Sequence, residues 1–250
     1  MTDSRRRRMS GGERREQLLG IGRALFAERG LDGTSVEEIA AKAKVSKPVV
    51  YEHFGGKEGL YAVVVDREMA LILEAVTAAL STEADYRRKL ELGAMALLEY
   101  IEESTDGFRI LVRDSHSGPG QGSFASLLSE IAARVEHLLG KELDHQGYDE
   151  DFAAMYAQML VGMIALTGQW WLGTRRPRRE DVAAHVVNLA WNGLARLEER
   201  PTLDPRRRAK ERERRERRQE KAQAKAEKAR ERALRRQPLQ PLEEVAPLEA

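Results

Sequence analysis

The segment Ser46-Lys47-Pro48-Val49 carries side chains that suit the edges of DNA bases. A lysine ammonium donates hydrogen bonds to guanine, a serine hydroxyl bonds to several bases, and an apolar side chain packs against the methyl group of thymine. In this chain Lys47 would reach guanine, and Pro48 or Val49 would contact thymine. These contacts require the four residues to form the first turn of a helix that enters the major groove.

Groups that suit DNA phosphates surround this segment. Thr34 or Ser35 would stand at the start of a short helix, where a hydroxyl and free backbone N–H groups face the same anion. The other candidate phosphate partners are Lys44, Tyr51, His53 and Lys57. Residues 34–57 therefore combine groups for reading bases with groups for holding phosphates.

Two helices are predicted in front of the base-reading segment. The first covers Glu13–Arg29, where apolar residues recur with a period of about 3.6 residues, and Gly30 supplies its stop. The second ends near Ala43. Its start is a capping box, in which either Thr34 pairs with Glu37 or Ser35 pairs with Glu38.

A third helix follows a turn of about three residues, Lys44-Val45-Ser46. Ser46 can cap this helix, Pro48 fits its first turn, and it closes at His53-Phe54 before the Gly55-Gly56 break. Two short helices joined by such a turn have the layout of a helix-turn-helix unit.

Several pieces of this region match a known family in combination. They are Gln17-Leu18-Leu19, Phe26-Ala27-Glu28-Arg29-Gly30, Thr34-Ser35-Val36-Glu37-Glu38-Ile39-Ala40, Val45-Ser46-Lys47, Tyr51-Glu52-His53-Phe54 and Lys57-Glu58-Gly59-Leu60. From Glu16 to Met69 the chain resembles the N-terminal domain of the TetR family. The resemblance implies a homodimeric regulator, usually a repressor, that changes its grip on an operator when a small molecule enters the C-terminal domain. It also implies that Tyr51, His53 and Lys57 touch the DNA backbone, whereas Glu52 departs from the neutral or aromatic residue often found at its position.

A helix-turn-helix layout is also compatible with a three-helix packing unit that binds nothing. The residues that would form its core are Val36, Ile39, Ala40, Val45, Val50 and Phe54. The flanking basic groups and the length of the matched stretch favour DNA binding.

The whole chain is predicted to be all-α, because helical periodicity recurs throughout and no segment alternates as a strand does. Further helices are predicted over Lys57–Leu80, Tyr86–Asp106, Phe108–Ser115, Gly122–Gln146, Asp149–Gly173 and Arg179–Arg200. The expected parts are a basic flexible N-terminus (1–12), a helix-turn-helix DNA-binding domain (13–57), a helical ligand-binding and dimerisation domain (58–203) and a charged tail (204–250).

The larger domain contains apolar residues that would suit a ligand pocket. The candidates are Tyr100, Phe108, Leu111, Phe124, Leu128, Ile131, Met155, Tyr156, Met159, Met163 and Trp170. A pocket of this composition would take a small hydrophobic effector such as a fatty acyl group or an aromatic molecule. The same methionine and aromatic stripe also fits an ordinary core, and both interpretations stay open.

Small residues on the last two predicted helices would let helices approach closely. They include Gly162, Ala165, Gly168, Ala183, Ala184, Ala190 and Gly193. The resemblance implies that these two helices pack against their symmetry mates as a four-helix bundle, although internal packing would produce the same pattern. A dimer is also expected because one recognition helix reads few base pairs, whereas a twofold pair reads two half-sites of a palindromic operator.

The charge is segregated along the chain, whose net charge is only +1. Residues 1–67 carry a net +3, residues 68–203 a net −8 and residues 204–250 a net +6. Arg206–Arg236 holds 16 basic and 6 acidic side chains, and pairs such as Glu211 with Arg215 and Glu213 with Arg217 have helical i,i+4 spacing. The tail is therefore either a solvated helix or disordered extension, or a sequence-independent phosphate binder.

Other classes of protein fit the sequence poorly. There is no cysteine, the five histidines lack the spacing of metal ligands, and hydrolase and phosphate-loop motifs are absent. We therefore expect no enzyme, no cofactor and no metal, and a pure adaptor protein is the remaining competitor.

The basic start lacks the apolar segment of a secretory signal, and no apolar run reaches the length of a membrane span, which favours a soluble, cytoplasmic protein. The sequence predicts a sequence-specific transcriptional regulator, a ligand-responsive repressor or, as the alternative, an activator or acyl-ligand sensor of the same family.

Overall fold

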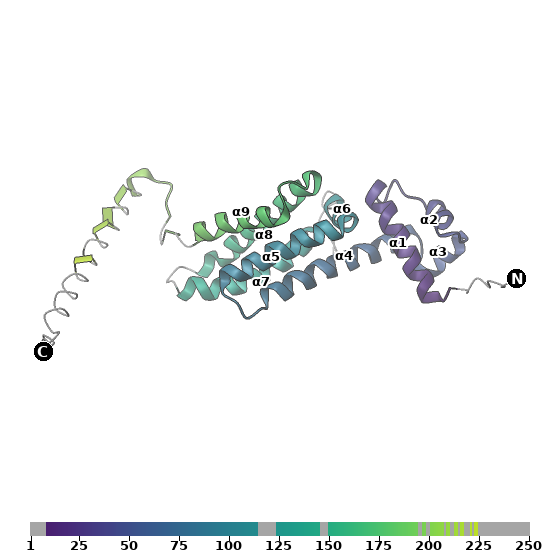
Figure 1. Cartoon of the computed structure of the whole chain (residues 1–250), viewed down its shortest axis with the longest axis horizontal. Helices are drawn as coiled ribbons and strands as arrows, with labels where there is room; N and C mark the ends of the chain where they lie inside the picture. Colours follow the sequence, from purple (N-terminus) through teal and green to yellow (C-terminus); the bar gives the residue numbers. More distant parts are fainter. Residues whose placement is uncertain are drawn as a thin grey trace, which may run out of the picture. The chain divides into compact units, whose positions relative to one another are not determined.

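A computed structural model describes most of the chain, and every regular element in that part is helical (Figure 1). The described residues are 9–114, 124–145, 150–194, 197–198, 201–207, 209–210, 213–214, 216–217, 221 and 223–224. The arginine run at residues 5–8, the connection at residues 115–123 and most of the tail lie outside them.

Three helices form the N-terminal part, and their starts follow from local capping. Helix α1 (Gly11–Arg29) begins with a capping box between Ser10 and Glu13. Helix α2 (Val36–Ala43) begins with the capping box of Ser35 and Glu38, so of the two predicted boxes this one forms. Helix α3 (Lys47–Phe54) has Pro48 in its first turn, as predicted.

Helix α4 (Lys57–Leu80) connects the N-terminal helices to the rest of the protein, packing against α1 at one end and against α5 and α7 further along (Figure 1). Its start lies very close to the end of α3, because a Cβ atom on Gly59 would overlap the carbonyl oxygen of Phe54. Leu60 is fully buried beside Gly22 of α1. The close approach at Gly59 fixes the C-terminal end of α3 against the first turn of α4.

The remaining helices form a bundle around the second half of α4. They are α5 (Tyr86–Glu103), α6 (Thr105–Asp114), α7 (Phe124–His145), the short 3-10 helix η1 (Glu150–Phe152), α8 (Ala153–Thr174) and α9 (Arg179–Leu194). Helix α5 packs against α4, α8 and α9, helix α7 packs against α8, and α6 packs against both α1 and α4. Most buried apolar residues of the α-helices belong to one hydrophobic core.

The break between α5 and α6 differs from the prediction, which placed it around Gly107. The α5 helix ends at Glu103, and Ser104 leaves the helical conformation with φ −117° and ψ 45°. Gly107 instead lies inside α6, where its missing side chain lets the helix approach α4 and α5. The glycine therefore serves close packing and does not interrupt a helix.

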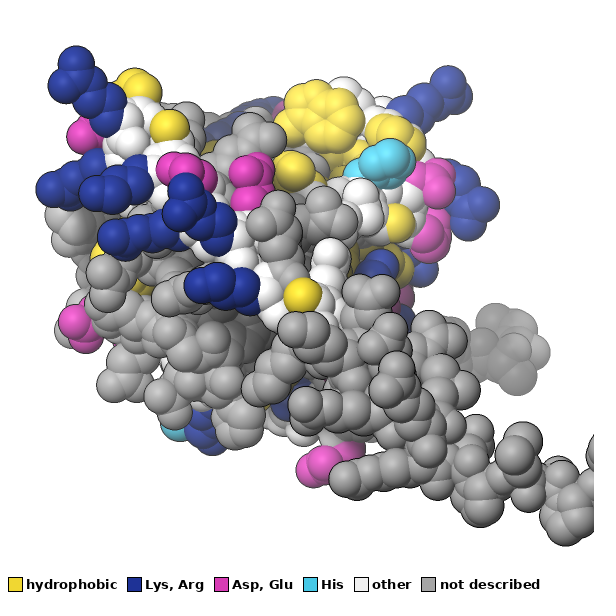
Figure 2. Space-filling model, turned by 90° about the vertical axis from the view of Figure 1, so that its left-hand side faces the viewer, with side chains coloured by type: hydrophobic (Ala, Val, Ile, Leu, Met, Phe, Trp, Pro, Cys, Tyr) yellow, Lys and Arg dark blue, Asp and Glu magenta, His cyan; other side chains and the backbone are white. Residues whose placement is uncertain are grey.

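On the face drawn in Figure 2, Lys and Arg side chains are most numerous on the left, with others on the right, and acidic groups lie among them. Among the described residues no helix is long and apolar enough to cross a membrane. Residues 198–250 form a separate unit, whose described positions from 205 onward are helical. In that unit Arg217 pairs with Glu213 at 2.7 Å, one of the two predicted i,i+4 pairs, and the Glu211–Arg215 pair lies outside the described residues.

Candidate nucleic-acid interface and apolar cavity

A tight turn sets the direction of the recognition helix α3. Lys44 ends α2 in the left-handed conformation, with φ 55° and ψ 45°, and its N–H donates to the carbonyls of Ala40 and Ala41. The N–H of Val45 also donates to Ala40, at 3.0 Å, while its side chain packs against the core. Because these bonds hold the turn from within, the Lys44 side chain is left exposed.

The first turn of α3 presents most of the predicted base-reading residues to solvent. Ser46, Lys47 and Pro48 are exposed, whereas Val49 is half-buried against the core. Ser46 occupies the N-cap position, but its side chain makes no capping hydrogen bond, contrary to the prediction. Val50 on the opposite face is fully buried and anchors the helix.

Lys47 has a partner that the sequence interpretation missed. Its ammonium forms an ion pair with the carboxylate of Glu37 in the first turn of α2, and this bond lowers the pKa of Glu37 below its ordinary value. Both side chains are more than half exposed, at 54% and 60%. Exposed ion pairs contribute little stability, so Lys47 can exchange this carboxylate for a base edge at small cost.

The candidate phosphate partners are placed differently from one another. Tyr51 is 53% exposed, and His53 is half-buried at the end of α3. The Lys57 ammonium donates to the carbonyl of Leu31 at 3.1 Å, which ties the loop before α2 to the start of α4. Ser35 is half-buried at the N-terminus of α2, where its hydroxyl accepts a hydrogen bond from the N–H of Glu38.

The structure contradicts the prediction that the Thr34 hydroxyl faces a phosphate. Thr34 is only 2% exposed, and its hydroxyl donates to the carbonyl of Gly30 at 2.8 Å. This bond closes the loop between α1 and α2. Of the two predicted alternatives, Ser35 is therefore the less buried residue.

Arg15 supports the far end of the recognition helix and was not predicted. Its guanidinium donates to the carbonyl of His53 at 2.8 Å and lies 4.4 Å from the centre of the Phe54 ring. An arginine in this position satisfies a C-terminal carbonyl of α3 and stacks on an aromatic face. Helix α1 therefore holds the C-terminal end of α3 through this arginine.

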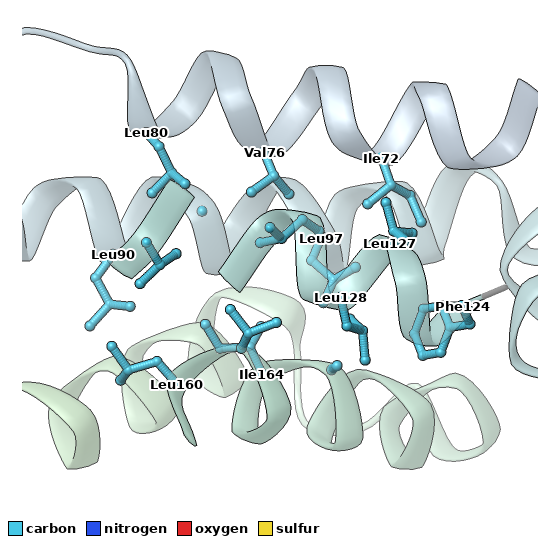
Figure 3. Close-up of a pocket in the computed structure, with 15 residues that line it drawn as sticks. Ile72, Val76, Leu80, Leu90, Leu97, Phe124, Leu127, Leu128, Leu160 and Ile164 are labelled. Atoms are coloured by element: carbon cyan, nitrogen blue, oxygen red, sulfur yellow. The ribbon is translucent and has the colours of Figure 1, made fainter. Parts of the chain in front are cut away.

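An apolar cavity lies within the bundle, about 560 Å³ in volume including the part that is open to solvent (Figure 3). Its lining consists of Ile72, Val76, Leu80, Leu90, Gly93, Leu97, Phe124, Leu127, Leu128, Ile131, Val135, Leu160, Val161, Ile164 and Ala165. In Figure 3 the side chains of α4 and those of α8 approach this space from opposite sides. The lining has no charged or hydrogen-bonding side chain, so the cavity suits an apolar ligand better than a polar one.

The predicted pocket residues divide into three groups. Phe124, Leu128 and Ile131 line the cavity. Tyr100, Phe108 and Leu111 are buried in the core outside it. Tyr156 and Met163 are half-buried, and Met155, Met159 and Trp170 are 44%, 60% and 55% exposed, so none of these five lines the cavity.

The prediction was wrong about which face of α8 points toward the cavity. Leu160, Val161, Ile164 and Ala165 face the cavity, and the methionine stripe lies on another side of the same helix. Because α8 is apolar nearly all round, its sequence did not reveal which side faces the bundle. The regular spacing of Ile72, Val76 and Leu80 on α4 was a signal for the opposite wall that the sequence interpretation did not use.

Comparisons with known proteins agree with this architecture. Residues 18–64 match the family described as bacterial regulatory proteins, tetR family, and residues 75–205 match the tetracyclin repressor-like C-terminal domain. The transcriptional activator FasR of Mycolicibacterium smegmatis is 31% identical over 195 residues, which cover 76% of this chain and 87% of FasR. The transcriptional repressor Rv3405c of Mycobacterium tuberculosis is 40% identical over 65 residues, which cover 26% of this chain and 35% of that protein.

A solved structure shows the same fold. The TetR-like transcriptional regulator from Rhodococcus sp. RHA1 superimposes with a TM-score of 0.61 at 26% identity, over 75% of this chain and 99% of that chain. Both domains of the family are matched in their usual order, and the helix-turn-helix and the helical bundle described above are the structures of those two domains. The chain belongs to the TetR family of DNA-binding transcriptional regulators.

Proposed function

We propose that this regulator binds a palindromic operator as a homodimer and changes its affinity for DNA when a small hydrophobic molecule enters the cavity. The observation that carries the proposal is the exposure of Ser46, Lys47 and Pro48 in the first turn of α3. Lys47 reads a guanine and Pro48 contacts a thymine methyl group. Lys44, Ser35, Tyr51, His53 and Lys57 hold phosphates on either side.

The unpartnered face of α8 supports the homodimer. Met155, Met159, Leu166 and Trp170 recur at helical spacing along this face and are 44%, 60%, 66% and 55% exposed. A row of large exposed apolar side chains of this kind is typical of an interface. Of the predicted small residues, Ala165, Gly168, Ala183 and Ala190 are buried within the protomer, whereas Gly162, Ala184 and Gly193 are not buried and can lie in the interface beside the larger side chains.

The cavity supports a hydrophobic effector, and its lining favours an alkyl or acyl chain over a ligand that needs hydrogen bonds. Burial of each methylene group contributes about 0.8 kcal/mol, so affinity should rise with chain length until the cavity is full. Such a regulator would act in the cytoplasm, where operator DNA and metabolites meet.

Repression is the expected direction of regulation, because occupying a promoter is enough to block it. Activation is the second candidate, since FasR, a relative that is similar along most of the chain, carries the name of an activator. Transcription from the bound promoter in a purified system, with and without the protein, distinguishes the two.

The DNA-binding part is tested by gel-shift titration and footprinting on the intergenic DNA beside the gene. Lys47→Ala should weaken operator binding by about 1–3 kcal/mol and leave binding to random DNA nearly unchanged. Lys141→Ala, which changes an exposed lysine of α7, is the matched control. An equal loss on operator and random DNA would assign Lys47 to a phosphate instead, and no binding at any salt concentration would contradict the proposal.

The effector is tested by thermal shift with saturated fatty acids and their coenzyme A thioesters of increasing chain length. A ligand at about 100 times its Kd should stabilise the folded protein by about 2.7 kcal/mol. The same compounds are then added to the operator complex. If none stabilises the protein or alters DNA binding, the cavity is not an effector site for acyl chains.

A further inference from the structure

Glu68, in the middle of α4, is a buried carboxylate outside the helix-turn-helix. It is 4% exposed, and it is the only fully buried charged residue in the described part of the chain. Arg23 of α1 donates to Oε1 from Nε at 2.6 Å and to Oε2 from Nη2 at 3.5 Å. The Tyr100 hydroxyl of α5 donates to Oε2 at 2.5 Å. We call Arg23, Glu68 and Tyr100 the Glu68 cluster.

The Glu68 cluster joins the DNA-binding helices to the bundle at one point. Arg23 belongs to α1, which supports α3 through Arg15. The backbone of α6 closes on the cluster at Gly107, where a Cβ atom would overlap Glu68 Oε2 and lie 2.6 Å from the Tyr100 hydroxyl. Helix α6 also contacts α1 directly, because Arg113 donates to the carbonyl of Phe26 at 3.2 Å. Four helices therefore meet around one carboxylate.

The cluster is also connected to the wall of the cavity. The Tyr100 ring contacts Phe108 edge to face at 6.5 Å between centroids, and Phe108 contacts Phe124 in the same way at 5.7 Å. Phe124 lines the cavity. Along α4, Ile72 of the cavity wall follows Glu68 by one helical turn. A ligand that moves Phe124 or Ile72 therefore acts on groups that touch or adjoin the cluster.

A buried carboxylate with two donors responds sharply to small displacements. Hydrogen bonds to an ionised group are short and weaken steeply once the distance or angle departs from its optimum. Removing one donor from a buried charge costs a large free energy. The cluster with both donors bonded to Glu68 and the cluster with one donor withdrawn are therefore two distinct states. The energy of a purely apolar contact at the same place would change only gradually with displacement.

We propose, on the basis of the ligand response proposed above, that the Glu68 cluster transmits the state of the cavity to DNA affinity. In this proposal the Tyr100 hydroxyl is the member that senses the cavity. Displacement of Phe124 and Phe108 withdraws the hydroxyl from Glu68, the carboxylate shifts its hold on Arg23, and α1 changes its angle to α4. Glu68, Arg23 and Tyr100 are positioning residues, since none of them touches DNA or lines the cavity.

The test is a double-mutant cycle that requires no identified ligand. Ala165→Leu and, separately, Gly93→Leu fill the cavity from two different helices, and a Cβ at Gly93 meets only Leu80, at 3.7 Å. Each is combined with Tyr100→Phe, which removes the hydroxyl and keeps the ring. Tyr156→Phe, a tyrosine of α8 outside the cluster, is the matched control. Operator Kd is measured for full-length proteins, and circular dichroism with thermal melting selects the variants that fold.

Filling the cavity should change operator Kd by about tenfold in the wild-type and Tyr156→Phe backgrounds, a usual size for coupling between two sites. In the Tyr100→Phe background the same filling should change Kd by less than about twofold. An equal change in all three backgrounds would overturn the role of the cluster while leaving the ligand response intact. No change from either folded filling variant would overturn the transmission itself, whereas failure of the wild type to bind operator DNA would overturn the proposed function.

Discussion

Replacing Thr34 by valine separates two roles that the sequence and the structure assign to the same hydroxyl. The hydroxyl is buried and donates to the Gly30 carbonyl at 2.8 Å, so valine preserves shape and removes one internal hydrogen bond. Loss of such a bond costs about 1–2 kcal/mol. For a protein of this size that corresponds to a fall in Tm of about 2–8 °C. DNA affinity of the folded protein should change by less than about twofold, because the hydroxyl does not reach the surface.

The assay pairs thermal unfolding with operator titration well below the melting temperature. Thr105→Val is the comparison variant outside the helix-turn-helix, because it removes a similar bond, from the Thr105 hydroxyl to the Ile101 carbonyl at 3.0 Å, together with the bond that this hydroxyl accepts from Arg175. Both variants should lose stability and keep operator binding. A Thr34→Val protein with unchanged Tm and a tenfold or greater loss of DNA affinity would refute the reasoning and return this hydroxyl to a phosphate.

Three further outcomes are expected. Glu37→Gln, compared with Glu74→Gln on the exposed side of α4, should strengthen operator binding by about two- to fivefold and change binding to random DNA less, because Lys47 no longer has to give up an ion pair before it reaches a base. An unchanged operator titration would contradict this. Leu166→Glu should shift sedimentation toward the monomer, since that side chain is 66% exposed on the proposed interface. The control Leu71→Glu changes a side chain that is 49% exposed on α4 and should leave the protein dimeric. If both variants stay dimeric, α8 does not form the interface. Burial and the bond to Glu68 raise the pKa of Tyr100 above its ordinary 10.0, so the unfolded chain releases this proton at a lower pH than the folded protein does, and stability falls as pH rises past 10. Between pH 10 and 11 the free energy of unfolding of the wild type, measured by denaturant titration, should fall by about 1 kcal/mol more than that of Tyr100→Phe. Parallel plots of unfolding free energy against pH for the two proteins would contradict this.

The sequence alone determined the helices, because helix formation depends mainly on local signals. Apolar periodicity predicted Lys57–Leu80 with the bounds that α4 has, and the capping pair Ser35 and Glu38 was one of two predicted starts for α2. The glycine pair after Phe54 ends the recognition helix as expected. Exposure of Ser46 to Pro48 also followed, since Val50 and the other apolar residues of the unit needed the opposite face for the core.

Only the tertiary structure decided which groups meet across long stretches of chain. Whether Thr34 faces phosphate or Gly30, and which side of α8 faces the cavity, depends on how neighbouring helices pack, since both choices are compatible with the local pattern. The Lys47–Glu37 pair requires the turn between α2 and α3 to bring their first turns together. The surroundings of Glu68 also depend on how the helices pack. In sequence it is one charged residue on an amphipathic helix, and it becomes a buried junction only when Arg23, 45 positions earlier, and Tyr100, 32 positions later, converge on it. Local periodicity carries no information about contacts at such separations, because they are set by the packing of whole helices.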